Sequence, residues 1–182
     1  MLFRSGAGVL PAVLLGIAKQ KGIGDEQLID ALATAGLIGA VVAHRASLSG
    51  AEGGCQAETG AAAGMAAGAA TEMLGGSPSQ AGHAVALAQQ GTLGLVCDPL
   101  GGLVELPCVF RNATGAAIAL AAVEMAMAGI TFAIPADEVI DTMGEIGREM
   151  DVRYRETAGG GLAATPTGRR LAKERLTQIK RA

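Results

Sequence analysis

The sequence has very few aromatic residues: its 182 residues include three phenylalanines, one tyrosine and no tryptophan. Half of the residues are nevertheless hydrophobic, with alanine prominent among them, and 28 more are glycine. A core that lacks large side chains must be filled by bringing helix backbones close together, and alanine is the strongest helix former. The composition therefore predicts one all-α domain over residues 1–182, a compact bundle of Ala/Gly-rich helices joined by glycine-rich loops.

The chain also lacks an excess of positive charge, with a net charge of −3. Nucleic-acid binding usually needs a basic surface, often with stacking aromatic side chains. The one basic run, at residues 168–182, includes Glu174 and is typical of a solvated terminal helix. No nucleic-acid partner is expected.

No export signal is evident, because residues 1–20 lack a basic start and a small-residue cleavage site. This predicts a cytoplasmic location. The longest apolar run, residues 113–134, could span a bilayer. However, Glu124 lies near its centre, and alanine and glycine favour insertion only weakly. A buried helix and no membrane association are expected.

Turn and capping residues divide the chain into predicted elements. Ser77 and Pro78 are typical of a helix start, and GGSPS separates two helices. Two short apolar segments flank Asp98-Pro99 and Gly101-Gly102, which favours a short β-hairpin near residues 93–106. Helices are predicted at residues 9–20, 25–46, 56–73, 78–89, 108–128 and 134–150 and at the C-terminus.

The three cysteines, Cys55, Cys97 and Cys108, form no CxxC pair, and their odd number argues against a disulfide framework. Buried structural thiols are the simplest interpretation. All three nevertheless fall at predicted junctions between elements, where functional residues concentrate.

Three kinds of chemistry fit these thiols. A zinc site would need a fourth ligand, and neither His44 nor His83 has ligand-like spacing from a cysteine. A cysteine nucleophile would need a base and would leave two cysteines unexplained. Three thiolates without a fourth suit an iron–sulfur cluster with one open iron. The residues alone leave all three open.

Longer motifs favour one of them. SLSGAEGGCQAETG, GLVCDPLGGLVELPC followed by VFRN, and YRETAGGGLAATPTG closely resemble the bacterial iron–sulfur L-serine dehydratases. The resemblance is to the α chain of the two-chain form, or to the catalytic domain of the single-chain form. It extends from about residue 5 to residue 168.

The resemblance implies conversion of L-serine to pyruvate and ammonia without pyridoxal phosphate. It implies that Cys55, Cys97 and Cys108 hold a 4Fe-4S cluster whose open iron acts as a Lewis acid on the substrate hydroxyl. It also implies a β-chain partner, and it leaves room for a higher oligomer.

Other site residues are predicted from their closeness to these motifs. Glu52 and Glu58 are the candidate catalytic bases, whereas His44 is expected on a helix surface. Arg111 and Arg155 are candidates to bind the substrate carboxylate, because a guanidinium suits that geometry. Further hydrogen bonds to substrate or cluster are expected from Ser47, Ser49, Gly50 and Asn112.

The chain departs from the family pattern at its start. The family usually has a stretch containing threonine, proline and asparagine before SGAGVLPAVL, whereas this sequence begins MLFR. The N-terminal part of the domain is therefore expected to be missing. Two alternatives follow: an inactive cluster-binding fragment, or a non-enzymatic Ala-rich helical protein with structural thiols.

Overall fold

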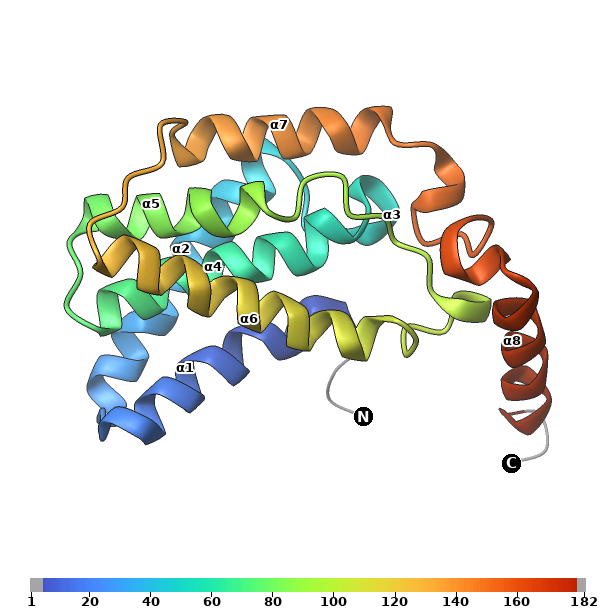
Figure 1. The fold of residues 1–182 in the computed structure, drawn as a ribbon, viewed down its shortest axis with the longest axis horizontal. Helices are drawn as coiled ribbons and strands as arrows, with labels where there is room; N and C mark the ends of the chain where they lie inside the picture. Colours follow the sequence, from blue (N-terminus) through green and yellow to red (C-terminus); the bar gives the residue numbers. More distant parts are fainter. Residues whose placement is uncertain (1–4, 180–182) are drawn as a thin grey trace.

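The computed structural model describes residues 5–179, in which the regular structure is helical (Figure 1). No strand forms among these residues, which confirms the predicted all-α class. The helices are α1 (Val9–Lys21), α2 (Asp25–Arg45), α3 (Gly50–Gly53), α4 (Ala61–Met73), α5 (Pro78–Gln90), α6 (Cys108–Met127), α7 (Ala136–Glu149) and α8 (Pro166–Ile179).

Helix α4 is the centre of the bundle, with α1, α2, α5 and α6 packed around it (Figure 1). Almost every residue of α4 is buried, and nearly all of the buried ones are alanine or glycine. A Cβ on Gly68 would lie 2.5 Å from Ile38 Cδ1 and 2.9 Å from Val85 Cγ2. Neighbouring helices thus approach α4 more closely than larger side chains would allow, as the composition predicts.

Capping explains why α5 begins where it does. The Ser77 hydroxyl accepts a hydrogen bond from the Gln80 N–H, and the Gln80 side chain accepts one from the Ser77 N–H. Pro78 occupies the first turn, where a missing N–H costs nothing. This capping box confirms the helix start predicted from the sequence.

The predicted hairpin at residues 93–106 is wrong. The segment instead forms a loop with one 3-10 turn, Leu100–Gly102. Its only β-type pairing is an isolated parallel bridge between Cys97 and Arg155, so it pairs with a distant segment and not with itself. Gly101 and Gly102 both adopt positive φ, and the chain folds back on itself without forming a ladder.

Helices α2 and α6 are each long and apolar enough to cross a membrane, by length and composition alone. This carries little weight, because the core helix of a soluble protein passes the same test. Both helices pack one face against α4, and α6 buries Ala119, Val123 and Ala126 there. The apolar run 113–134 is not one helix, since α6 ends at Met127.

Helix α7 crosses α3 with two glycines in contact, and this crossing gives a prediction about stability. A Cβ on Gly147 would lie 2.8 Å from the Gly53 Cα, a backbone atom that cannot rotate away. Gly147→Ala is therefore expected to lower the free energy of unfolding by about 1–3 kcal/mol in urea denaturation.

The matched control is Gly36→Ala, in the exposed middle of α2, where an added Cβ would meet nothing within 4 Å. This change should raise the free energy of unfolding by about 0.5–1 kcal/mol, because alanine has the better helix propensity. Equal effects at the two positions would contradict the close α3–α7 crossing.

Candidate metal and active site

The three cysteines converge from separate parts of the chain, and all three are buried. Cys55 lies between α3 and a π-helical turn, Gln56–Gly60, that leads into α4. Cys97 lies in the loop after α5, and Cys108 is the first residue of α6. The prediction that all three occupy junctions between elements is confirmed.

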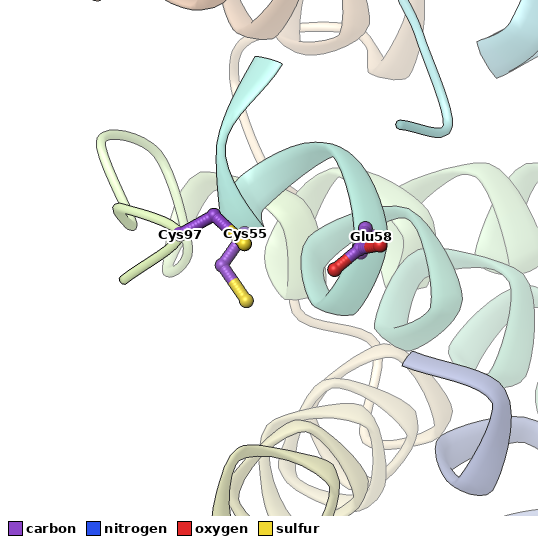
Figure 2. Close-up of side chains that lie close together, drawn as sticks. All are labelled: Cys55, Glu58 and Cys97. Atoms are coloured by element: carbon purple, nitrogen blue, oxygen red, sulfur yellow. The ribbon is translucent and has the colours of Figure 1, made fainter. Parts of the chain in front are cut away.

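The Glu58 side chain lies near two of these thiols, those of Cys55 and Cys97 (Figure 2). The sulfurs of Cys55 and Cys97 and a Glu58 carboxylate oxygen all lie within 4.8 Å of one another, a grouping that could hold a metal ion. Glu58 Oε2 is buried and has no hydrogen-bond partner in the described structure. A buried oxygen without a partner is costly, so this oxygen is a candidate ligand atom.

The thiols differ in how readily they ionise. A hydrogen bond from Cys97, outweighing burial and aided by Thr59 and Arg111, lowers the pKa of Cys55 to about 6. The same hydrogen bond, together with burial, raises the pKa of Cys97. Burial, reinforced by the charge of Cys55, raises the pKa of Cys108 to about 11. Without metal, the hydrogen-bonded Cys55–Cys97 pair therefore loses a proton more readily than Cys108 does.

The pKa of the Glu58 carboxyl group is also shifted by its surroundings. Burial first, then the negative charges of Cys55 and Glu156, raises the pKa of Glu58 to about 7, opposed by a hydrogen bond from the Gly50 backbone. The surroundings of Glu58 thus favour its neutral form, unlike those of a typical surface carboxylate.

Two glycines of the GAEGGC segment have specific roles. A Cβ on Gly50 would lie 3.0 Å from the Cys97 sulfur and 2.9 Å from Glu58 Cδ. Gly54 has φ +75°, which favours glycine, and a Cβ there would lie 2.9 Å from the Leu95 carbonyl oxygen. Gly50 thus allows the backbone to pass directly beside the Cys97 sulfur and the Glu58 carboxylate.

Arg111 and Asn112, predicted to bind substrate, each have protein partners. Arg111 donates to the Val96 carbonyl at 2.8 Å and forms an ion pair with Asp98 at 2.8 Å. The Asn112 amide accepts from the Gly8 N–H at 2.8 Å and donates to the Cys108 carbonyl at 2.9 Å. These contacts hold the start of α6 in place, and substrate binding by either residue stays a prediction.

Arg155, unlike Arg111, has a side-chain nitrogen without a protein partner among the described residues. Its backbone pairs with Cys97, and its Nε is buried without a hydrogen-bond partner. Its side chain borders a hollow of about 410 Å³ that Ser47 and Glu52 also line. A guanidinium nitrogen with no protein partner, next to a cysteine, suits an anionic ligand better than Arg111 does.

The remaining predicted residues lie at the edge of this group. Glu52 is exposed and accepts a hydrogen bond from the Ser47 hydroxyl, so it is not among the residues gathered around the thiols. The Ser49 N–H donates to the Ser47 oxygen at 3.0 Å. His44 is exposed near the end of α2, as expected.

Sequence reasoning missed three site residues. Thr59 lies 3.5 Å from the Cys55 sulfur through its hydroxyl, and Glu156 acts on Cys97 and Glu58 through its charge. Asp98, next to Cys97, was interpreted only as a turn residue although it is almost fully buried. The motifs contained all three residues, but nothing in their local pattern distinguishes such roles.

A helical bundle that gathers three buried thiols and a carboxylate with one unpartnered oxygen is an all-α protein with a candidate thiolate metal centre. The chain belongs to the serine dehydratase alpha chain family, whose model matches residues 5–163. The predicted family resemblance is thereby confirmed.

Individual relatives agree with this assignment. The chain is 56% identical over 168 residues to a probable L-serine dehydratase alpha chain of Bacillus subtilis, covering 92% of this chain and 56% of that protein. It is 42% identical over 172 residues to an L-serine dehydratase alpha chain of Peptoniphilus asaccharolyticus, covering 94% and 59%. An L-serine dehydratase of Streptomyces coelicolor is 47% identical over 159 residues, covering 86% and 35%. The chain thus spans little more than half the length of the first two relatives.

The residues present fit a thiolate-bound metal group. Thiolates are the usual ligands of iron–sulfur clusters, and all three thiols are buried, with the cation Arg111 near Cys55 to offset negative charge. The orphaned Glu58 oxygen also faces this site. The donor set therefore suits a cluster at least as well as a single ion.

Proposed function

We propose that this chain is the catalytic unit of an L-serine dehydratase that converts L-serine to pyruvate and ammonia. Cys55, Cys97 and Cys108 would hold a 4Fe-4S cluster. When bound, such a cluster supplies a Lewis acid that makes the substrate hydroxyl a better leaving group. The observation that supports this most strongly is the grouping of Cys55 and Cys97 with Glu58, with the buried Cys108 near enough for the charges of Cys55 and Glu58 to act on it.

Glu58 is the proposed proton acceptor, in preference to Glu52. Its side chain borders a hollow of about 250 Å³ whose other lining residues are almost all apolar, including Leu10, Leu48 and Met65. An apolar wall excludes competing water, and Oε2 has no hydrogen-bond partner among the described residues that would compete for the proton. The α proton of serine would pass to Glu58 as the hydroxyl leaves.

The rest of the reaction needs no further catalytic group from the chain. Loss of the α proton and the hydroxyl gives 2-aminoacrylate and water. The enamine tautomerises to an imine, and one water molecule hydrolyses it to pyruvate and ammonia. Arg155 is the proposed group for the substrate carboxylate, through its unpartnered Nε, and its hollow adjoins that of Glu58 at Ala57, which lines both.

The proposed function also leads us to propose a partner chain and a cellular location for this protein. Relatives named as alpha chains point to a β-chain partner, which we propose for this chain too. We propose a cytoplasmic enzyme that uses no pyridoxal phosphate. The second candidate function, a zinc site, is favoured only by the Cys55–Glu58–Cys97 grouping, which a single ion would also fit.

The test is anaerobic purification of the chain, with iron and sulfide analysis followed by a pyruvate assay with L-serine. About four iron and four sulfide per chain are expected, as a 4Fe-4S cluster requires. Turnover is expected in the presence of a β chain, and the assay without it measures how far the chain acts alone. Bound zinc without sulfide would overturn the cluster. Iron and sulfide without pyruvate under both conditions would leave a cluster-binding fragment.

A further inference from the structure

Asp98 is a buried carboxylate placed between two of the proposed ligands in the chain. Its side chain is 2% exposed, and Oδ1 lies 2.8 Å from an Arg111 nitrogen. Oδ2 accepts a hydrogen bond from the Leu162 N–H at 2.6 Å. Oδ1 receives no directed hydrogen bond, so the charge of Arg111 is what balances its burial. One side chain thus connects the Cys97 loop, helix α6 and the loop that contains Leu162.

The partners of Asp98 are themselves attached to the cysteines. Arg111 lies three positions after Cys108, on the first turn of α6, and also donates to the Val96 carbonyl at 2.8 Å. The Asp98–Arg111 pair therefore joins the residue after Cys97 to the helix that begins with Cys108. Neither ligand can move far without separating the pair.

Backbone hydrogen bonds attach Cys97 to one other segment, residues 154–156. Its N–H donates to the Tyr154 carbonyl at 2.8 Å, and its carbonyl accepts from the Glu156 N–H at 2.8 Å. From Cys97 to Cys108 the loop has one 3-10 turn and no strand pairing of its own. Asp98 is thus the side chain that fixes the start of this loop to two other elements.

We propose that Asp98 is a positioning residue that sets the placement of Cys97 relative to Cys108. The inference deepens the proposed function, since it takes these two cysteines as ligands of one metal group. A buried ion pair is weak evidence for stability, but removing one partner leaves the other charge unpaired. Loss of the Asp98 charge should therefore loosen the ligands more than it unfolds the bundle.

Gly161 offers a way to disturb Asp98 without mutating it. A Cβ on Gly161 would lie 2.2 Å from Asp98 Oδ2. Gly102 is a matched control, because it also has positive φ, at +71°, but an added Cβ would meet nothing within 4 Å. Gly161→Ala and Gly102→Ala should impose a similar backbone strain, and only the first displaces Asp98.

The experiment compares Asp98→Asn, Gly161→Ala and Gly102→Ala with the unaltered chain, each reconstituted anaerobically. A chelator should remove iron about tenfold faster from the first two, the lower end of losses caused by disturbing groups that orient metal ligands. Circular dichroism should show the helical content unchanged. Iron loss from Asp98→Asn and Gly161→Ala no faster than from Gly102→Ala would overturn the proposal, and Gly161→Ala decides the question if Asp98→Asn does not fold.

A second readout separates this proposal from the proposed function. In the metal-free chain, alkylation of Cys97, located by mass spectrometry, should be severalfold faster in Asp98→Asn and Gly161→Ala than in Gly102→Ala, because a loosened loop opens more often and exposes the buried thiol. Alkylation of Cys55 should not accelerate, because the hydrogen bond from Cys97 and the charge of Arg111 lower its pKa, and loosening these contacts leaves less thiolate. If the unaltered chain binds no iron, the proposed function fails, whereas this measurement still tests Asp98. Equal acceleration at Cys55 and Cys97 would overturn the positioning role.

Discussion

Cys97→Ser is expected to remove most of the bound iron and to reduce turnover by at least about a hundredfold. Mutation of groups that only orient metal ligands already lowers metal affinity or activity about 10–100-fold, so loss of a ligand should lower them further. Cys97 is fully buried and lies against both Cys55 and Glu58, so no solvent molecule can easily replace its sulfur. The measurements are iron and sulfide per chain and the rate of pyruvate formation, with protein kept anaerobic.

Thr71→Ser is a suitable control, because Thr71 is buried in α4 and bonds only the Ala67 carbonyl of its own helix. This change should leave iron content and turnover close to their original values. The ligand assignment is wrong if Cys97→Ser retains its full iron, sulfide and activity.

The Glu58→Gln protein is expected to retain its iron content but to lose most of its activity. Removing a general base costs about 10²–10⁴-fold in rate, and glutamine keeps the size of the side chain while losing the ability to accept the α proton. Iron and sulfide should stay at the level of the unaltered chain, because thiolates are the proposed ligands. The decisive measurement is kcat with saturating L-serine on protein of known iron content.

The same substitution at Glu52 compares the two candidate bases. Glu52 is exposed and bonded to Ser47, so Glu52→Gln should reduce kcat severalfold at most. A larger loss from Glu52→Gln than from Glu58→Gln would reverse the assignment. A loss of iron from Glu58→Gln would instead make Glu58 a ligand, as its position between Cys55 and Cys97 permits.

The two predictions together test the division of roles at the site. Cysteine loss should change metal content and activity, whereas glutamate loss should change activity alone. A chain with structural thiols and no metal would show neither pattern. The proposed cluster and the proposed base can therefore fail separately.

Local signals predicted the helices well, because those signals act within one or two turns. Ser77 and Pro78 determine the start of α5, and Pro107 precedes α6 at Cys108, where a helix was expected. The predicted helix over residues 56–73 corresponds to the π-helical turn Gln56–Gly60 followed by α4. The short helix α3 lies between the predicted helices at residues 25–46 and 56–73 and was missed because its four residues include two glycines.

Predictions failed where distant segments decide the outcome. The hairpin at residues 93–106 does not form because Cys97 pairs its backbone with Tyr154 and Glu156, more than fifty positions away in the chain. Arg111 and Arg155 looked equivalent as carboxylate binders, yet one is ion-paired to Asp98 and the other has a buried nitrogen without a partner. Composition and spacing give no information on such pairings.

The sequence by itself determined the helical class, most helix starts, the family and the three cysteines. Alanine content, capping residues and motif wording are properties of short stretches, so they can be interpreted without a structure. Only the tertiary structure decided that Glu58, not Glu52, lies against the thiols and that Asp98 joins the two ligand-bearing segments. Burial, charge pairing and unpartnered atoms depend on what surrounds a side chain, and the fold alone brings those surroundings together.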